Sequence, residues 1–165
     1  MELRNFLEQM SEFNRRHRET TKISSLRFCC LEEAVLHFGS EYTAKPRPKG
    51  FRRGTPKQCF YNSYRLVVNR PNLVYVEGFA FLKNFAGFPI HHAWAVETGS
   101  HEAIDVTSDN FSSYFGIAFQ ASYVKSCWRN HPDGVSLLDN YGDDYPILRM
   151  SDEEASSKIF VVNHK

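Results

Sequence analysis

The sequence has no long hydrophobic run: no stretch approaches the roughly 18 consecutive apolar residues that a membrane-spanning helix needs. Its N-terminal segment lacks the apolar core of a signal peptide, so we expect a cytoplasmic protein with no membrane partner, in the host cytoplasm if a phage encodes it. An excess of one charge is also lacking, because 20 basic residues face 19 acidic ones and the net charge is +1. This balance excludes a protein that binds nucleic acid over its whole surface.

Internal repeats, low-complexity tracts and C-x-x-C pairs are absent as well, which excludes a solenoid, a disordered chain and a typical structural zinc site. The 165 residues, of which 42% are hydrophobic and 15% aromatic, are enough for one domain with a core. We expect a single domain over 1–165, with an N-terminal helical part (1–44), a basic loop (45–57), a helix and sheet (58–124) and an irregular C-terminal part (125–165).

Apolar residues recur at helical spacing in three segments. Segment 1–20 is expected to form an amphipathic helix, and segment 31–38 a shorter one that stops at Gly39. A third helix would begin in the tetrapeptide TPKQ (55–58), where threonine and glutamine have the spacing of a capping box. It would end at the NRP tripeptide (69–71), because proline cannot continue a helix.

Strand-like segments follow the third helix. Segment 73–82 is apolar on both faces, which is typical of a central strand. Segments 90–97 and 103–107 flank a predicted tight turn at 98–100, and 116–124 would be a further strand. Helices that precede and feed an antiparallel sheet indicate an α+β domain.

Four cysteines are present, and without an extracellular context we expect free thiols. Cys29, Cys30 and Cys127 are interpreted as small buried residues. The predicted capping box places Cys59 fourth in its helix, within the first turn. The free amide hydrogens and the dipole of that turn lower the pKa of a cysteine and favour the nucleophilic thiolate. Cys59 is therefore the candidate nucleophile.

A nucleophilic cysteine needs a base, and the base needs an orienting group. Strand alternation puts His92 and its neighbour His91 on opposite faces of the predicted hairpin. A turn at 98–99 would place His92 opposite Asp105, and a turn at 99–100 would place it opposite Thr107 with Asp105 on the diagonal. Both registers keep His92 and Asp105 within reach, so the spacing allows a Cys-His-Asp triad.

The segment from about residue 57 to residue 119 resembles the papain-like and transglutaminase-like superfamily of cysteine enzymes. QCFYNS opens a helix with a cysteine, HAW lies on a strand and IDVT on the next, and transglutaminase-like domains use HAW and DxT for their histidine and aspartate. The pieces YVEGFAF and YFGIAF are similar to a small bacterial and phage-type branch.

The resemblance implies a papain-like/transglutaminase-like fold, in which a nucleophile helix packs on an antiparallel β-sheet. It implies Cys59 as nucleophile, His92 as general base and acid, and Asp105 as the group that orients the histidine. It implies no metal and no organic cofactor. His92 is preferred to His91 because it matches the histidine of HAW and shares a face with Asp105.

Four further residues are candidates for the oxyanion site or the surroundings of the triad. Gln58 would either donate to an oxyanion or cap the helix, and Asn62, one turn beyond Cys59, would be a site group or a packing residue. Glu77 lies in an apolar strand, where a buried carboxylate needs a partner, and would be a substrate-side group or a paired structural one. Trp94 would line the core or a pocket.

These features predict a thiol-dependent acyl-transfer enzyme, a peptidase- or amidase-type hydrolase with a protein or peptide substrate; a transglutaminase or deamidase is an alternative. The loop 45–57 holds six basic residues and no acid, and it would be either a solvated loop or a contact for an acidic partner. The other alternative is a non-catalytic or degenerate papain-like module. It would bind a protein or RNA partner through this loop, as a phage or bacterial effector or inhibitor.

Overall fold

The computed structural model describes residues 2–21, 26–84, 88–131 and 134–161. Within them the chain forms a mixed α+β structure around a curled five-stranded sheet of order β3-β2-β5-β1-β4. The strands are β1 (Ser40–Ala44), β2 (Leu73–Leu82), β3 (Ile90–Glu97), β4 (Glu102–Ala103) and β5 (Phe111–Phe119). The helices are α1 (Leu3–Thr21), α2 (Leu31–Phe38), α3 (Cys59–Val68), α4 (Ala121–Asn130), α5 (Pro146–Arg149) and α6 (Asp152–Lys158), with a 3₁₀ turn at Tyr141–Asp143.

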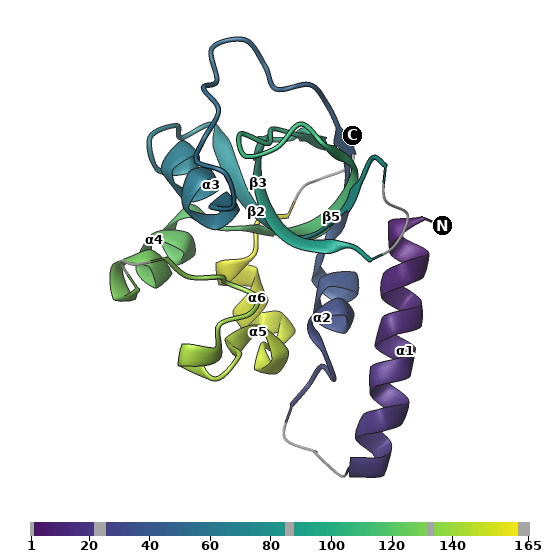
Figure 1. Ribbon diagram of the computed structural model, residues 1–165. Coiled ribbons are helices and arrows are strands. Elements are labelled where there is room, and N and C mark those ends of the chain that lie inside the picture. Colours follow the sequence, from purple (N-terminus) through teal and green to yellow (C-terminus); the bar gives the residue numbers. More distant parts are fainter. Residues whose placement is uncertain (1, 22–25, 85–87, 132–133, 162–165) are drawn as a thin grey trace.

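The two edges of the sheet meet, so the strands curl into a ring (Figure 1). β1 runs parallel to β4, and the other paired strands are antiparallel. Directly after β4, Ile104 exchanges two backbone hydrogen bonds with Ala95 of β3, at 3.1 and 2.7 Å. This bridge closes the ring and brings the residue that follows Ile104 beside β3.

The inside of the ring is a small core to which all five strands contribute. It includes Tyr42 of β1, Val76 of β2, Trp94 of β3, Ala103 of β4 and Tyr114 of β5, all buried. Side chains of a strand alternate between its two faces, so the intervening residues point outward. The inside of the ring is therefore filled by side chains, with the fully buried Trp94 as its largest member.

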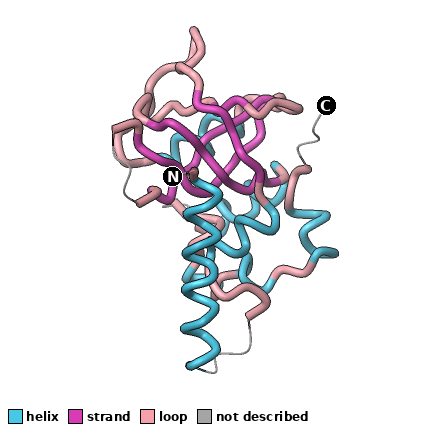
Figure 2. The backbone as a smooth tube through the Cα atoms, turned by 90° about the vertical axis from the view of Figure 1, so that its right-hand side faces the viewer, coloured by secondary structure: helices cyan, strands magenta, loops and turns pink. Residues whose placement is uncertain are grey.

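The helices cover the outside of the ring and form the larger core with it. Leu7 of α1, Val35 of α2, Trp128 of α4 and Ile147 of α5 are buried in one cluster with the outward residues of β2 and β5. The strands gather at one end of the molecule, and α1 runs from them toward the opposite end (Figure 2). The helices remove the apolar outer face of the ring from water, and this burial stabilises the fold.

Helix α3 packs across the bridge that closes the ring. Its buried Leu66 contacts a cluster that contains Ala95, Ile104 and Val106. The helix ends at Val68, and the chain turns through Asn69 and enters β2 at residue 73. This packing directs the first turn of α3 toward the segment that carries the candidate histidine and aspartate.

Several sequence predictions are confirmed. The helix 31–38 with its stop at Gly39 and the strands 73–82 and 90–97 have the predicted bounds. The N-terminal helix is present, no helix or strand interrupts 45–57, and the α+β class is correct. In the described part of the chain, no helix is long and apolar enough to cross a membrane.

The predicted strand 103–107 is wrong beyond its first residues. Only Ala103 belongs to a strand and Ile104 to an isolated bridge, because the carboxylate of Asp105 accepts hydrogen bonds from the amides of Thr107 and Ser108 and turns the chain. The short strand β1 was not predicted at all; its one buried side chain, Tyr42, gives no readable period.

The predicted strand 116–124 is also wrong in its bounds. β5 begins at Phe111 and ends at Phe119, and α4 follows with Val124, Cys127 and Trp128 buried at helical spacing. The C-terminal part is not irregular either, since α4, α5 and α6 form within it. α5 and α6 have four and seven residues, too few to display a period in the sequence.

The substitution Gly78→Ala is expected to reduce the free energy of unfolding by about 2–3 kcal/mol. Gly78 of β2 lies opposite Gly116 of β5, and a Cβ on Gly78 would lie 2.2 Å from the carbonyl oxygen of Phe115. Denaturant unfolding followed by circular dichroism measures the change. Gly142→Ala is the control, because its Cβ would meet no atom closer than 3.6 Å. Equal stabilities of the two variants would contradict the proposed close approach of β2 and β5.

Candidate active site

Cys59 is the first residue of α3, and its side chain is half-buried. The predicted capping box is wrong: Lys57 has a left-handed backbone with φ of 63°, so residues 55–58 are not helical. Gln58 occupies the N-cap position and makes no side-chain capping bond. Cys59 therefore lies first in the helix and not fourth, still in the turn whose backbone N–H groups have no partner within the helix.

His92 and Asp105 form a buried pair. His92 Nε2 donates a hydrogen bond of 2.7 Å to Asp105 Oδ2, and both residues are 4% exposed. The bridge between Ala95 and Ile104 puts Asp105 on the diagonal from His92, although the tight turn lies at 98–99, where the Ser100 amide donates to the Glu97 carbonyl at 2.9 Å. The second of the two predicted registers is therefore the one that forms.

Asp105 is held by three donors besides His92. Its Oδ1 accepts hydrogen bonds from the backbone amides of Thr107 at 2.7 Å and Ser108 at 3.1 Å, and Tyr114 donates its hydroxyl to Oδ2 at 3.1 Å. These contacts compensate a buried carboxylate for the water that it loses. They also fix its direction, so Asp105 holds His92 in one orientation with Nδ1 as the free ring nitrogen.

Cys59 lies next to the His92 ring and influences its protonation. Burial alone would lower the pKa of His92, but the hydrogen bond and charge of Asp105, together with the hydrogen bond and charge of Cys59, raise that pKa to about 9. His92 is therefore a cation at neutral pH, with a carboxylate on one side and a sulfur on the other.

Asn62 positions the loop in front of Cys59. Its side chain accepts a hydrogen bond from the Thr55 amide at 3.2 Å, donates to the Thr55 carbonyl at 2.7 Å, and donates to Thr107 Oγ1 at 2.9 Å. Gly54 passes so close that a Cβ there would lie 2.4 Å from the Asn62 side chain. The predicted alternative of a packing residue therefore describes Asn62: it joins the segment before Cys59 to the turn after Asp105.

Glu77 lies on the opposite face of the sheet from His92 and is fully buried. Tyr75 and the backbone amide of Leu137 donate to its Oε2, both at 2.9 Å. Its Oε1 accepts from His91 at 3.0 Å, from the Leu138 amide at 3.1 Å and from the Ser136 hydroxyl. Of the two alternatives predicted for Glu77, its contacts are those of a paired structural carboxylate.

Hydrogen bonds outweigh burial at Glu77. Burial would raise its pKa, but the hydrogen bond and charge of His91, with the bonds from Ser136 and Leu137, lower the pKa below its ordinary value. The carboxylate is therefore ionised, and it anchors residues 136–138 on the outside of the sheet. His91 contributes to this cluster, with Phe60 packed against its ring at a centroid distance of 5.1 Å.

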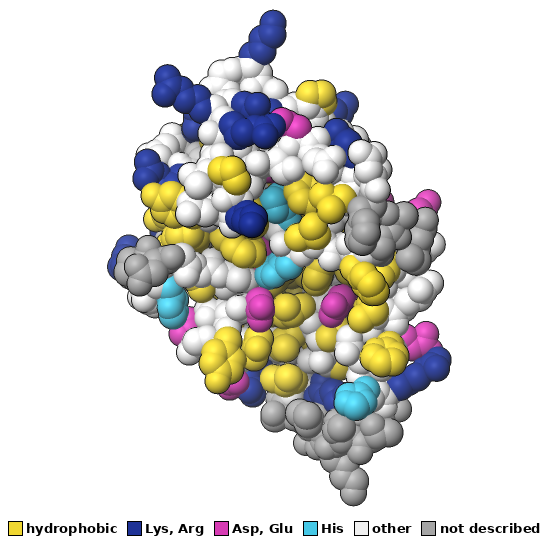
Figure 3. All heavy atoms as spheres, viewed as in Figure 1, with side chains coloured by type: hydrophobic (Ala, Val, Ile, Leu, Met, Phe, Trp, Pro, Cys, Tyr) yellow, Lys and Arg dark blue, Asp and Glu magenta, His cyan; other side chains and the backbone are white. Residues whose placement is uncertain are grey.

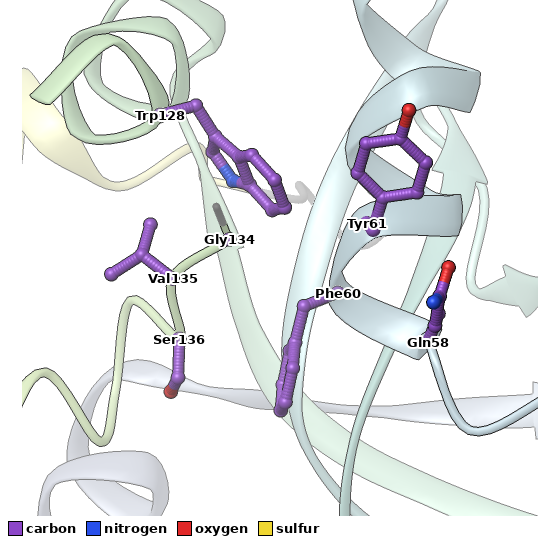
Figure 4. Close-up of a pocket in the computed structure, with 7 residues that line it drawn as sticks. All are labelled: Gln58, Phe60, Tyr61, Trp128, Gly134, Val135 and Ser136. Carbon is purple, nitrogen blue, oxygen red and sulfur yellow. The ribbon is translucent and has the colours of Figure 1, made fainter. Parts of the chain in front are cut away.

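A pocket of about 580 Å³ lies between the first turn of α3 and the segment that follows α4 (Figure 4). Its lining residues are Gln58, Phe60, Tyr61, Trp128, Gly134, Val135 and Ser136. In Figure 4, Phe60 and Tyr61 on α3 face Trp128 of α4 and the segment 134–136 across the pocket. Gln58 and Phe60 are the chain neighbours of Cys59, which is not itself among the lining residues, so the pocket lies at the first turn of α3 and has aromatic walls.

The sequence interpretation missed several of these residues. The wall segment 134–136 and the Tyr114 hydroxyl come from distant parts of the chain, and no local pattern links them to Cys59. Trp128 belongs to the pocket wall, whereas Trp94 lies in the core inside the ring and does not line this pocket.

The other three cysteines have different surroundings. Cys127 is buried, as expected, and Cys29 and Cys30 are only half-buried. Burial is the largest cause that raises the pKa of each of the three thiols. Within the described residues, no group of three or more His, Cys, Asp or Glu side chains has a geometry that could hold a metal ion.

Comparisons with known proteins find nothing similar: no protein-family model, no curated protein and no solved structure matches the chain.

The pKa of His92, measured by NMR on protein with labelled histidine, is expected to be about 9. Asp105→Asn should lower it, because burial is then opposed by the sulfur of Cys59 alone. Since the folded-state pKa is raised, the stability that the His92 cation contributes is fully present below pH 6.5 and is lost as the pH rises through 9. Titration of Cys59→Ala in parallel measures how much of the increase in the pKa of His92 comes from the sulfur. A wild-type pKa at or below 6.5 would refute the buried ion pair.

Glu77→Gln is expected to reduce the free energy of unfolding by about 3 kcal/mol, because it leaves a buried NH₂ group facing backbone amide donors. The same change should increase amide hydrogen exchange at Leu137 and Leu138, whose N–H groups bond to the carboxylate. Glu97→Gln, an exposed position on the neighbouring strand, is the control. If both variants unfold at the same denaturant concentration, Glu77 does not anchor the pocket wall.

Proposed function

We propose that this chain is a thiol-dependent acyl-transfer enzyme, a peptidase- or amidase-type hydrolase with a papain-like/transglutaminase-like fold. One observation carries the proposal: a buried histidine, held through Nε2 by Asp105 at 2.7 Å, lies next to the cysteine that begins α3. Nucleophile, base and orienting group are then neighbours in space, as such catalysis requires. The pocket lined by the chain neighbours of Cys59, Gln58 and Phe60, gives a substrate a place to bind.

In the first half of the reaction, the Cys59 thiolate attacks a substrate carbonyl carbon. A sulfur–carbon bond forms, and the carbonyl oxygen becomes an oxyanion. The backbone N–H of Cys59 has no partner within α3 and can donate to that oxyanion. The Gln58 side chain makes no capping bond and is a second donor from the same position. His92 then gives its proton to the leaving nitrogen, the carbon–nitrogen bond breaks, and a thioester remains.

In the second half, His92 is neutral and accepts a proton from a water molecule. The water oxygen attacks the thioester carbonyl, the sulfur–carbon bond breaks, and the products are a carboxylic acid and the thiolate–imidazolium pair. Asp105 keeps Nε2 of His92 occupied throughout, so that Nδ1 handles the proton in both halves. Hydrolysis is favoured over transfer because it needs only water as the acceptor.

Transfer to an amine and deamidation remain alternatives with the same thioester. They differ in the acceptor or in the amide attacked, and both would use Cys59 and His92 in the roles above. The non-catalytic alternative is a module that binds a partner and does not use its cysteine. It differs in one measurable respect: its complex survives Cys59→Ser, whereas an acyl-enzyme cannot form without the thiol.

Incubation with p-nitrophenyl acetate, an activated ester, is expected to add one acetyl group to Cys59, detectable by mass spectrometry of the intact chain and its peptides. Iodoacetamide should alkylate Cys59 at neutral pH at least about tenfold faster than Cys127, because a thiolate is the nucleophile. His92→Ala should remove this selectivity.

Cys127→Ser is the matched control and should retain full acetylation at Cys59. Alkylation of Cys59 no faster than that of Cys127 in the wild-type protein would overturn the proposed nucleophile. Acetylation that persists in Cys59→Ser would locate the reactive group elsewhere.

A further inference from the structure

A second hollow, of about 490 Å³, lies on the other side of Tyr61 from the aromatic pocket. It is bounded by the loop residues 50–55 and by α3 with the turn that follows it. Four arginines line it, namely Arg52, Arg53, Arg65 and Arg70, and no aspartate or glutamate does. Lys and Arg side chains gather at this end of the molecule, over the loop between β1 and α3 (Figure 3). We call this hollow the arginine cleft.

Nearby acids neutralise part of the positive charge of the basic loop, including one arginine of the cleft, Arg53. Lys45 pairs with Glu102 at 3.0 Å, and Arg47 and Arg53 both pair with Asp109. In the part of the chain that the structure describes, no carboxylate pairs with Arg52, Arg65 or Arg70. Three of the four arginines that line the cleft are therefore left without a carboxylate partner, whereas the fourth, Arg53, is paired with Asp109.

Aromatic rings, and not acids, hold two of these arginines. The Arg65 guanidinium donates a hydrogen bond of 2.9 Å to the Tyr61 hydroxyl and lies 5.6 Å from the centroid of its ring. The Arg70 guanidinium lies 5.0 Å from the centroid of Phe51. Contact with a ring face leaves N–H groups of the guanidinium free for a planar anion, which arginine binds in a bidentate manner.

The cleft adjoins the proposed acyl site. Tyr61 lines both hollows, and Asn62 and Val106 connect the cleft to the first turn of α3 and to the residue after Asp105. Arg65 lies about 9 Å along the helix axis from Cys59, since a helix rises 1.5 Å per residue. An extended peptide covers that distance in about three residues.

We propose that the arginine cleft binds an acidic side chain of a polypeptide substrate, about three residues from the acyl group that reacts with Cys59. The inference rests on the proposed function and adds a substrate class to it. An aspartate or glutamate carboxylate matches the unpaired guanidinium groups in charge and shape. The small size of the cleft favours one carboxylate over nucleic acid, whose affinity comes from many phosphate contacts along a basic surface.

The first test uses N-acetyl tetrapeptide p-nitrophenyl esters that end in phenylalanine, with Glu or Gln at each of the three preceding positions. Glu at one position should raise kcat/KM about five- to tenfold over Gln, in keeping with a partly exposed charge pair. Arg65→Met with Arg70→Met should abolish that preference, and 0.5 M salt should weaken it. Lys49→Met removes a positive charge from the same loop outside the cleft and should preserve it.

The second test is equilibrium binding and does not depend on catalysis. A fluorescein-labelled Glu-containing peptide should bind the Cys59→Ser protein more tightly than its Gln counterpart, and Arg52→Met should weaken that binding without disturbing α3. If all the esters acylate Cys59 without any preference for Glu, the proposed role of the cleft is overturned and the proposed thiol enzyme is not. No acylation by any ester, with peptide binding retained, would instead overturn the proposed function. A single-stranded RNA that displaces the peptide at a lower concentration than unlabelled peptide does would also overturn the acidic-peptide assignment.

Discussion

The Asp105 carboxylate accepts four hydrogen bonds, and they come from three separate places in the fold. His92 belongs to β3, Tyr114 belongs to β5, and the amides of Thr107 and Ser108 form the turn that Asp105 itself creates. β3 and β5 are not neighbours, because β2 lies between them in the sheet. Their side chains meet at Asp105 only because the ring closes through the bridge between Ala95 and Ile104. Closure of the sheet and orientation of His92 therefore depend on the same short segment.

The dipeptide His91-His92 divides two roles between the faces of β3. His92 points to the inner face and pairs with Asp105, whereas His91 points outward and pairs with Glu77. Each buried carboxylate is compensated by several donors, as the cost of burying a charge requires. His92 lies next to Cys59, so its protonation bears on the sulfur. The Glu77 cluster instead fixes the segment 136–138 and thereby one wall of the pocket.

Local patterns predicted those parts of the fold whose signals are local. The strand 73–82 is continuously apolar, the alternation in 90–97 separates His91 from His92, and the short distance from His92 to Asp105 allowed only two plausible registers. The helix start at Cys59 was less predictable, because the left-handed backbone of Lys57 cancels the capping pattern. A sequence motif does not reveal which backbone region a lysine will adopt.

Non-local contacts account for what the sequence could not predict. β1 shows one buried tyrosine in five residues and becomes a strand because β5 and β4 lie on either side of it. Tyr114 reaches Asp105 through the inside of the ring, and Ser136 reaches Glu77 from 59 residues away in sequence. Such contacts need the complete topology, since neither partner carries a signal for the other.

Asn62 connects the candidate triad to the loop that borders the arginine cleft. The candidate triad lies on a helix start, a strand and a hydrogen-bonded turn, which are elements suited to precise geometry. The arginine cleft lies between a loop and α3, and loops are where recognition surfaces are commonly found. Asn62 bonds to Thr55 in that loop and to Thr107 in the turn of Asp105, and a Cβ on Gly54 would clash with it. The loop can therefore change its outer residues without displacing the triad, while its inner end is fixed by the same contacts that hold the turn beside His92.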